Sequence, residues 1–108
     1  MASRVDDEEL FYYACLWPHV TGLPMRVWVP DMAAKDEYLR VQTSHTAESR
    51  PNEVALVSLS SEPRIFEGNL PEDDASAVTA FVARNLDALR AHRNGECDSG
   101  ELVYRLRR

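Results

Sequence analysis

The side chains best suited to metal binding are two cysteines, Cys15 and Cys97, and three histidines, His19, His45 and His92. A zinc site would need pairs of them at spacings such as C-x₂₋₄-C or H-x₃₋₅-H. Neither two cysteines nor two histidines stand at such a spacing, because all five residues are scattered singly along the chain. The sequence therefore predicts no metal site.

The motifs of nucleophilic and phosphate chemistry are also missing. The four glycines are isolated, so neither a P-loop nor a G-x-G-x-x-G turn occurs, and no G-x-S-x-G turn presents a serine. Cys15 falls on the apolar stripe of an expected helix, which favours a buried and unreactive thiol. We expect no catalytic residue and no cofactor. A small hydrolase that uses Cys15 or a serine is the third hypothesis.

Carboxylates are the chemical groups that the sequence does concentrate. The two acidic runs are Asp6, Asp7, Glu8 and Glu9, and Glu72, Asp73 and Asp74. Each run stands where a helix is expected to begin, and anions there stabilise the unpaired backbone N–H groups and the helix dipole. The same carboxylates could instead dock on an arginine- or lysine-rich partner, with electrostatic steering raising the association rate. Both interpretations stay open.

The overall charge limits the range of partners. With 108 residues and a formal net charge of −6, the chain fits one acidic domain. A phosphate backbone would be repelled, so we expect no direct binding to nucleic acid. We expect Arg105, Arg107 and Arg108 to be solvated, or to interact with the dipole of a last helix.

The sequence also indicates a compartment. No run approaches the ~18 apolar residues of a membrane span. The acidic start lacks the basic and apolar pattern of a signal peptide, and two cysteines are too few for a disulfide framework. We therefore expect a cytoplasmic protein, with residues 1–5 mobile.

Trp28 is the aromatic residue with the most informative position. It alternates with Val27 and Val29 in a short strand pattern, so its side chain points to the other face of the strand. It either packs on that opposite sheet face or forms an exposed anchor of the kind enriched in interface hot spots. We include Trp28 with the acidic runs among the expected partner-binding residues.

The N-terminal half predicts one helix followed by strands. Leu10, Phe11, Ala14 and Cys15 follow helical spacing and predict a helix from Asp6 to about Leu16, although Phe11-Tyr12-Tyr13 could instead begin a strand. Strands are expected at Met25–Val29, Tyr38–Ser44 and Glu53–Ser60, with a possible short fourth strand at Arg64–Glu67 and a loop at His45–Asn52.

The C-terminal half predicts helices. Pro71 and Arg93 bound a long helix, whose buried stripe is Val78, Phe81, Val82, Leu86 and Leu89. Asn85 falls on the same face, where we expect it to bond a loop carbonyl at the margin of the core. Asp98 and Glu101 resemble a capping box that opens a short last helix, with Leu102, Val103 and Leu106 inward.

Short connections between the strands favour antiparallel pairing. The sequence therefore predicts a single α+β domain over 1–108. We expect a twisted antiparallel sheet of three or four strands, packed against the long C-terminal helix, with an N-terminal helix and a short final helix.

Three short segments carry a resemblance. They are Thr21-Gly22-Leu23-Pro24-Met25-Arg26-Val27-Trp28-Val29, Asn85-Leu86-Asp87-Ala88-Leu89 and Asn94-Gly95-Glu96. Over roughly residues 21–106 the chain resembles a set of small single-domain proteins of bacteria and phages, with a TGLP-x-x-VWV opening and an N-x-D-x-L helix. The resemblance implies a protein that travels on mobile elements. Because that group has no known activity, no functional residue can be assigned from it. The chain departs from the group at His92-Arg93, where an aromatic residue is expected before Asn-Gly.

The leading hypothesis is a non-enzymatic protein that binds the surface of another protein. Its concrete form is a phage-encoded inhibitor, similar in style to anti-CRISPR proteins, which blocks a basic surface of a bacterial nucleic-acid-binding complex. A structural or regulatory homodimer, joined through a sheet edge or Trp28, is the alternative.

Overall fold

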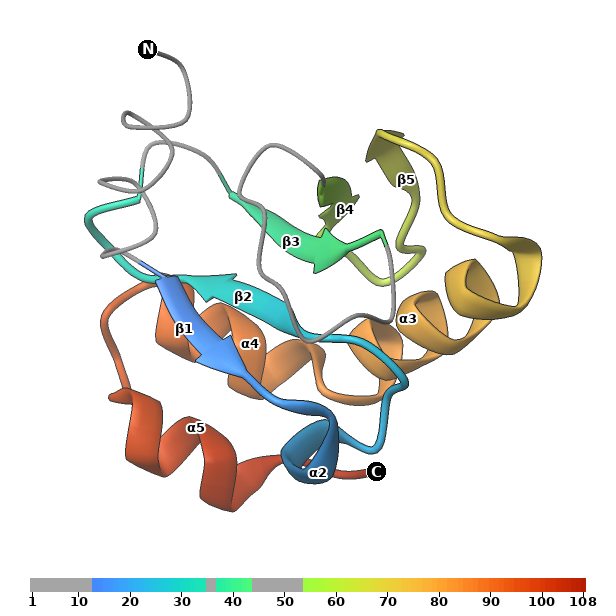
Figure 1. The fold of residues 1–108 in the computed structure, drawn as a ribbon. Coiled ribbons are helices and arrows are strands. Elements are labelled where there is room, and N and C mark those ends of the chain that lie inside the picture. Colours follow the sequence, from blue (N-terminus) through green and yellow to red (C-terminus); the bar gives the residue numbers. More distant parts are fainter. Residues whose placement is uncertain (1–12, 35–36, 44–53) are drawn as a thin grey trace, which may run out of the picture.

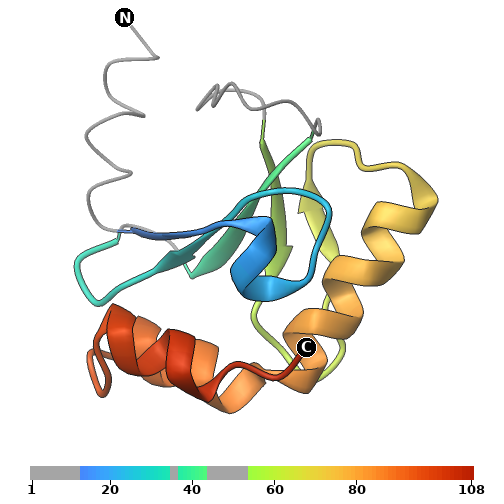
Figure 2. The same cartoon turned by 60° about the horizontal axis from the view of Figure 1, so that its bottom comes forward.

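A computed structural model describes residues 13–34, 37–43 and 54–108. In this part of the chain, five strands form one antiparallel sheet in chain order, and helices cover one of its faces (Figures 1 and 2). The strands are β1 (Tyr13–Leu16), β2 (Val27–Pro30), β3 (Tyr38–Gln42), β4 (Val54–Ser58) and β5 (Ile65–Glu67). The helices are α2 (Pro18–Thr21), α3 (Glu72–Arg84), α4 (Leu86–Arg93) and α5 (Ser99–Arg105).

The core lies between the sheet and the helices. Alternate residues of the strands, such as Val27, Leu39 and Val57, are fully buried against the apolar side chains of the helices. On the helical side the fully buried residues include Phe81 of α3 and Leu102 of α5. The predicted α+β class is confirmed, but the prediction of three or four strands was wrong because there are five.

The additional strand is β1, in the segment where the sequence predicted the end of a helix. Ala14 lies opposite Val29 in the register of β1 on β2, and Cys15 lies opposite Trp28. This pairing provides hydrogen-bond partners for the backbone of the segment, while the twofold alternation buries Ala14 and exposes Cys15. The predicted helix is therefore wrong for Tyr13–Leu16, and the expected burial of Cys15 is wrong for the same reason. The earlier residues of the predicted helix, 6–12, lie outside the described residues.

The other predicted strands are present with shifted ends. The second strand begins at Val27 rather than at Met25, and the possible fourth strand of the prediction is present as β5. The predicted loop His45–Asn52 lies outside the described residues. Gly68 follows β5 with a φ of +88°, and a Cβ at this position would lie 2.8 Å from the Cα of Ala55. Glycine therefore lets the chain leave β5 close to the backbone of β4.

The predicted long helix is interrupted at Asn85. The side-chain amide of this residue donates to the carbonyl of Phe81 at 3.0 Å. A side chain that bonds a backbone carbonyl in this way competes with the regular helical ladder. Asn85 lies at the junction of two helices, α3 and α4, and its backbone N–H also donates to the carbonyl of Phe81.

The short final helix begins as predicted. Asp98 accepts a hydrogen bond from the backbone N–H of Glu101 at 2.8 Å, which confirms the N-terminal cap. Leu102 is buried and Leu106 packs against the core, one helical turn later. The expectation that Val103 points inward was wrong: its position, one residue beyond Leu102, turns it about 100° away from the core.

Candidate functional site

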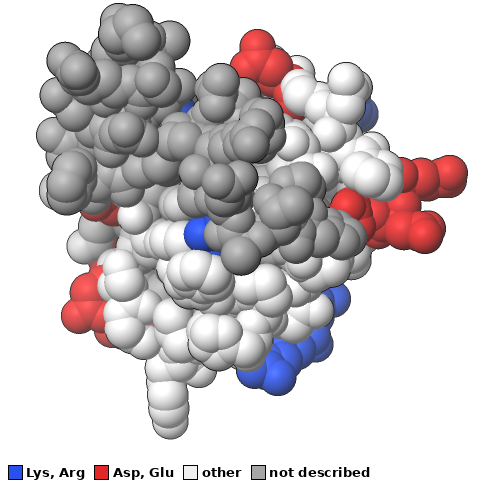
Figure 3. All heavy atoms as spheres, viewed as in Figure 1, with Lys and Arg blue, Asp and Glu red and all other residues white. Residues whose placement is uncertain are grey.

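The two ends of α3 have opposite charge. Glu72 and Asp73 are exposed in the first turn, whereas Arg84 is exposed in the last. Figure 3 shows acidic atoms over the start of α3 and basic atoms near the C-terminus of the chain. With a rise of about 1.5 Å per residue, the helix separates these charges by about 20 Å.

Of the predicted acidic residues, some are exposed, one is buried and the others lie outside the described residues. Glu72 and Asp73 are exposed, but Asp74 is only 7% exposed and cannot offer its side chain to a partner. The expectation of an exposed Asp74 fails because this position of the first turn faces the sheet side of the helix. The run Asp6, Asp7, Glu8 and Glu9 lies outside the described residues.

Trp28 is 4% exposed, so the alternative of an exposed anchor is wrong. It packs on the sheet face opposite the helices, where Tyr13 and Ala34 are buried beside it. The guanidinium of Arg26 lies 4.5 Å from the ring centre of Trp17 and 6.0 Å from that of Trp28. The indole ring of Trp28 is therefore packed on this face, with the Arg26 guanidinium near it.

Cys15 lies on this second face of the sheet and is exposed. Partial desolvation nevertheless raises the pKa of its thiol above the ordinary value of 9.0, and the nearby Arg26 partly offsets that rise. At neutral pH the side chain is therefore mainly a thiol, and thiols are weak nucleophiles.

An exposed aromatic residue that the sequence analysis did not single out lies in the edge strand β5. Phe66 is 64% exposed, and its ring stacks on that of Tyr38 with 4.6 Å between centroids and 12° between planes. Glu67 is exposed beside it. The sequence signal for this strand was the pair of apolar residues Ile65 and Phe66, which does not show which of them is exposed.

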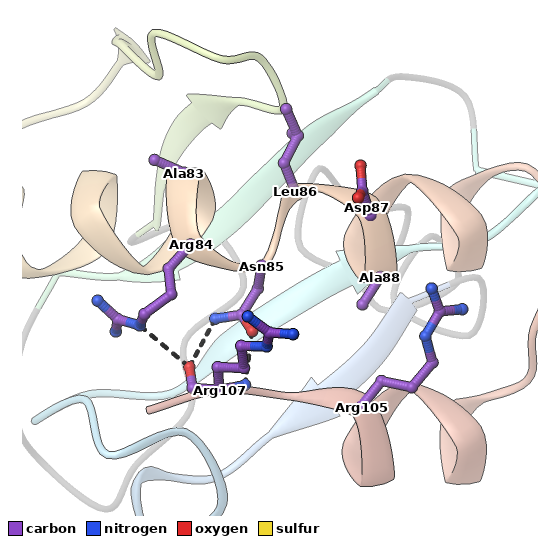
Figure 4. Close-up of a pocket in the computed structure, with 8 residues that line it drawn as sticks. All are labelled: Ala83, Arg84, Asn85, Leu86, Asp87, Ala88, Arg105 and Arg107. Atoms are coloured by element: carbon purple, nitrogen blue, oxygen red, sulfur yellow. Dashed lines mark hydrogen bonds between the residues drawn. The ribbon is translucent and has the colours of Figure 1, made fainter.

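The C-terminal tail is attached to the α3–α4 junction. The backbone N–H of Arg107 donates to Oδ1 of Asn85 at 2.6 Å, and the carbonyl of Arg107 accepts from Nδ2 of Asn85 at 2.8 Å. Nε of Arg84 donates to the same carbonyl at 3.2 Å. The expectation that Asn85 bonds a loop carbonyl is thus confirmed, and Figure 4 shows these contacts.

A hollow of about 370 Å³ opens beside these contacts, between the junction and the tail. Three arginines and one carboxylate are its charged lining groups: Arg84, Arg105, Arg107 and Asp87. In Figure 4 the carboxylate of Asp87 lies across the α4 ribbon from the arginines. The hollow is therefore a positively charged region of an acidic protein.

A second hollow, of about 330 Å³, brings together His92, Cys97 and Ser99. Nδ1 of the buried His92 lies 2.9 Å from the carbonyl oxygen of Pro30, and its Nε2 lies 3.3 Å from Oγ of Ser99. A carbonyl can only accept, so Nδ1 donates to Pro30, and in the tautomer with its one proton on Nδ1 the other nitrogen, Nε2, accepts from the Ser99 hydroxyl. This pair could move a proton, but a backbone carbonyl takes the place that a carboxylate has in a hydrolytic triad.

Cys97, in the same hollow, is a buried thiol. Burial raises its pKa, the carboxylate of Glu101 raises it further, and Arg105 opposes both effects. A protonated thiol in this position is a packing group rather than a nucleophile.

Comparisons with protein-family models, with curated proteins and with solved structures find no match to this chain. Within residues 13–34, 37–43 and 54–108, no group of three His, Cys, Asp or Glu side chains is arranged to hold a metal ion. Within the same residues, no helix combines the length and the apolar character needed to cross a bilayer.

Proposed function

We propose that the protein acts without catalysis, by binding another protein through an acidic edge formed by Phe66 and Glu67 of β5 and by Glu72 and Asp73 of α3. The observation that supports this proposal most is the exposure of Phe66 in the neighbourhood of carboxylates. Large aromatic side chains in contact surfaces account for much of the binding energy of protein complexes.

The acidic edge combines two features that suit a basic partner. β5 and the start of α3 are joined by residues 68–71 and lie on the same side of the molecule (Figure 1). Carboxylates there would steer a positively charged surface into contact, while Phe66 would supply apolar area once contact is made. Tyr38 holds the Phe66 ring by stacking, so less side-chain freedom is lost on binding.

β5 also offers backbone groups to a partner. Among the described strands it pairs with β4 only, so its other edge has no strand beside it. An extended segment of a partner could add to this edge, with main-chain hydrogen bonds supplementing the charge contacts.

The finer form of the proposal names the partner as a bacterial nucleic-acid-binding complex and the protein as its inhibitor, in the manner of an anti-CRISPR protein encoded by a phage. A groove that binds nucleic acid is basic, and a body of net charge −6 competes for it with phosphate. The support for this form is charge complementarity.

The test uses the exposed Cys15 as the site of a fluorescent label, because it lies in β1, the strand at the other edge of the sheet from β5. Fluorescence anisotropy then measures binding to a purified nucleic-acid-binding complex with its groove empty, and to the same complex loaded with nucleic acid. We expect binding to the empty complex only, with an affinity that falls as salt is added. Absence of binding to every such complex at low ionic strength would contradict the proposal.

Matched variants locate the surface. Phe66→Ala and the double change Glu72→Lys with Asp73→Lys are each expected to weaken binding by about tenfold or more. Glu96→Lys is the control, because Glu96 is exposed in the turn after α4 and lies outside the acidic edge. A loss with Glu96→Lys as large as that of the double change would assign the effect to net charge and remove the acidic edge from the proposal. An unchanged affinity of Phe66→Ala, which leaves the charge as it is, would remove Phe66 from the proposed surface.

A homodimer is the second candidate function, and the two outer strands of the sheet favour it. β1 and β5 each pair with a single neighbour among the described strands, so either could pair with the same strand of a second copy. The form of this hypothesis that used Trp28 as the contact is excluded by the burial of its side chain. Light scattering separates a dimer from a monomer that waits for a different partner.

A further inference from the structure

We propose that the hollow between the α3–α4 junction and the C-terminal tail is a binding site for a small polyvalent phosphate, with a diphosphate group as its best ligand. It lies at the end of α3 opposite the acidic edge, and the inference goes beyond the proposed function because it needs no protein partner.

The charge of the hollow favours an anion. Arg84, Arg105 and Arg107 come from α3, α5 and the tail, and Asp87 is the one carboxylate in the lining. The lining therefore has two positive charges in excess, within a chain of net charge −6. Guanidinium groups donate hydrogen bonds in a fork that matches the oxygens of a phosphate.

Most N–H groups of the three guanidiniums are available to a ligand, although Nε of Arg84 donates to the carbonyl of Arg107 and Arg105 also interacts with the side chain of Cys97. In the part of the chain that the structure describes, Arg107 and Arg84 make no ion pair. Arg105 pairs with Glu101 at 3.7 Å, and both side chains are well exposed, so this contact is weak and easily exchanged for a ligand.

Arg107 is held in place before a ligand arrives. Asn85 bonds both its N–H and its carbonyl, and Arg84 donates to the same carbonyl. Arg108, the next residue, donates from its guanidinium to the carbonyl of His19 at 2.5 Å. Fixing the backbone of the tail in this way removes the part of the entropy cost that a mobile tail would incur on binding.

The start of α4 and the end of α3 meet at the hollow. Leu86, Asp87 and Ala88 form the first turn of this helix and line the hollow. Asn85 at its N-cap makes no capping hydrogen bond with its side chain, which is bound to Phe81 and the tail instead. The positive end of the α4 dipole adds to the arginine charges, but the negative end of α3, whose Ala83 and Arg84 also line the hollow, opposes it, so the arginines supply the net positive field.

The residues that line the hollow also restrict the size and the chemical class of the ligand. None of its side chains is aromatic, so it offers no platform on which a nucleobase could stack. A volume of about 370 Å³ is near the lower limit of small-molecule pockets. These features favour recognition of the phosphate groups themselves. The exposed side chains of Arg84, Arg105 and Arg107, whose guanidinium groups lie apart in Figure 4, would turn toward a diphosphate bound between them.

Titration calorimetry with sodium pyrophosphate at low ionic strength tests the site. We expect saturable binding of one pyrophosphate per chain, with weaker binding of inorganic phosphate. ADP has the same diphosphate group and is expected to bind with an affinity within a few fold of that of pyrophosphate. Much tighter ADP binding, or no saturable binding of pyrophosphate, would overturn the proposal.

Two variants provide the matched comparison. Arg107→Gln should weaken pyrophosphate binding at least tenfold and leave the melting temperature unchanged, because the fold uses only the backbone of Arg107. Arg90→Gln removes an exposed arginine of α4 that does not line the hollow, and it should leave binding within about twofold. Equal weakening by both variants would mean that pyrophosphate responds to general surface charge, and the site would be rejected.

Discussion

Asn85 and Arg107 hold each other through a reciprocal pair of hydrogen bonds across 22 residues of sequence. The side-chain amide of Asn85 bonds the N–H and the C=O of Arg107, much as a neighbouring strand would. One side chain at the junction of α3 and α4 thus holds the C-terminal tail on the core.

We expect Asn85→Ala to lower the free energy of unfolding by about 1–3 kcal/mol, because it leaves the partly buried N–H of Arg107 without its partner and removes the side-chain hydrogen bonds to the carbonyls of Phe81 and Arg107. Urea unfolding measures the loss, and Arg90→Gln serves as the control. Amide hydrogen exchange at Arg107 should also become faster. An unchanged exchange rate would show that other contacts hold the tail.

Phe81→Ala should destabilise the protein by about 3–5 kcal/mol, because Phe81 is fully buried between α3 and the sheet. Thermal unfolding should show a fall in melting temperature of at least about 10 °C. Ser76→Ala, an exposed change on the same helix, should shift it by no more than a degree or two.

The two cysteines should differ in reactivity. Ellman's reagent is expected to modify Cys15 in the native protein and to reach Cys97 only after unfolding, because Cys97 is buried. The raised pKa of Cys15 reduces its thiolate fraction at neutral pH, so its reaction rate should still be rising at pH 9. A rate that levels off below pH 8 would contradict this expectation.

Ser99 is expected to resist a fluorophosphonate reagent. Its hydroxyl meets Nε2 of His92, but the other ring nitrogen is held by the carbonyl of Pro30, which stabilises an imidazolium less than a carboxylate does. Intact-mass spectrometry after incubation provides the measurement. An adduct on Ser99 that disappears in His92→Gln would revive the hydrolase hypothesis.

Light scattering should give a mass near 12.3 kDa at micromolar concentration if the protein is a monomer that binds a different partner. A mass near twice that value would favour the homodimer. Charged substitutions at the exposed Cys15 of β1 or at Phe66 of β5 would then show which edge forms the contact.

The helical part of the fold was predictable because its signals are local. Asp98 caps the N–H of Glu101, three residues away, and Phe81 lies on a stripe with a clear helical period. The capping geometry and the buried face of α3 both follow from such short-range rules.

The first strand of the sheet and the attachment of the tail depend on contacts between residues that are distant in sequence. Ala14 and Cys15 fit a helical stripe and a strand equally well over four residues, and the choice was made by pairing with Val29 and Trp28 of β2. Likewise, the position of Asn85 indicated a polar contact at the edge of the core, but nothing local could name Arg107 as its partner. The acidic runs were visible in the sequence, whereas the exposure of Phe66 and the burial of Asp74 were not.

The opposite charges at the two ends of α3 have a consequence for the moment before any complex forms. In the field of a strongly charged surface, such a molecule experiences a torque as well as an attraction, and it turns as it approaches. A basic surface would draw the Glu72 end forward, and an anionic one would draw the Arg84 end. Added salt would weaken this alignment over distances beyond about 10 Å, so it should slow productive encounters more than it speeds the dissociation of a complex already formed.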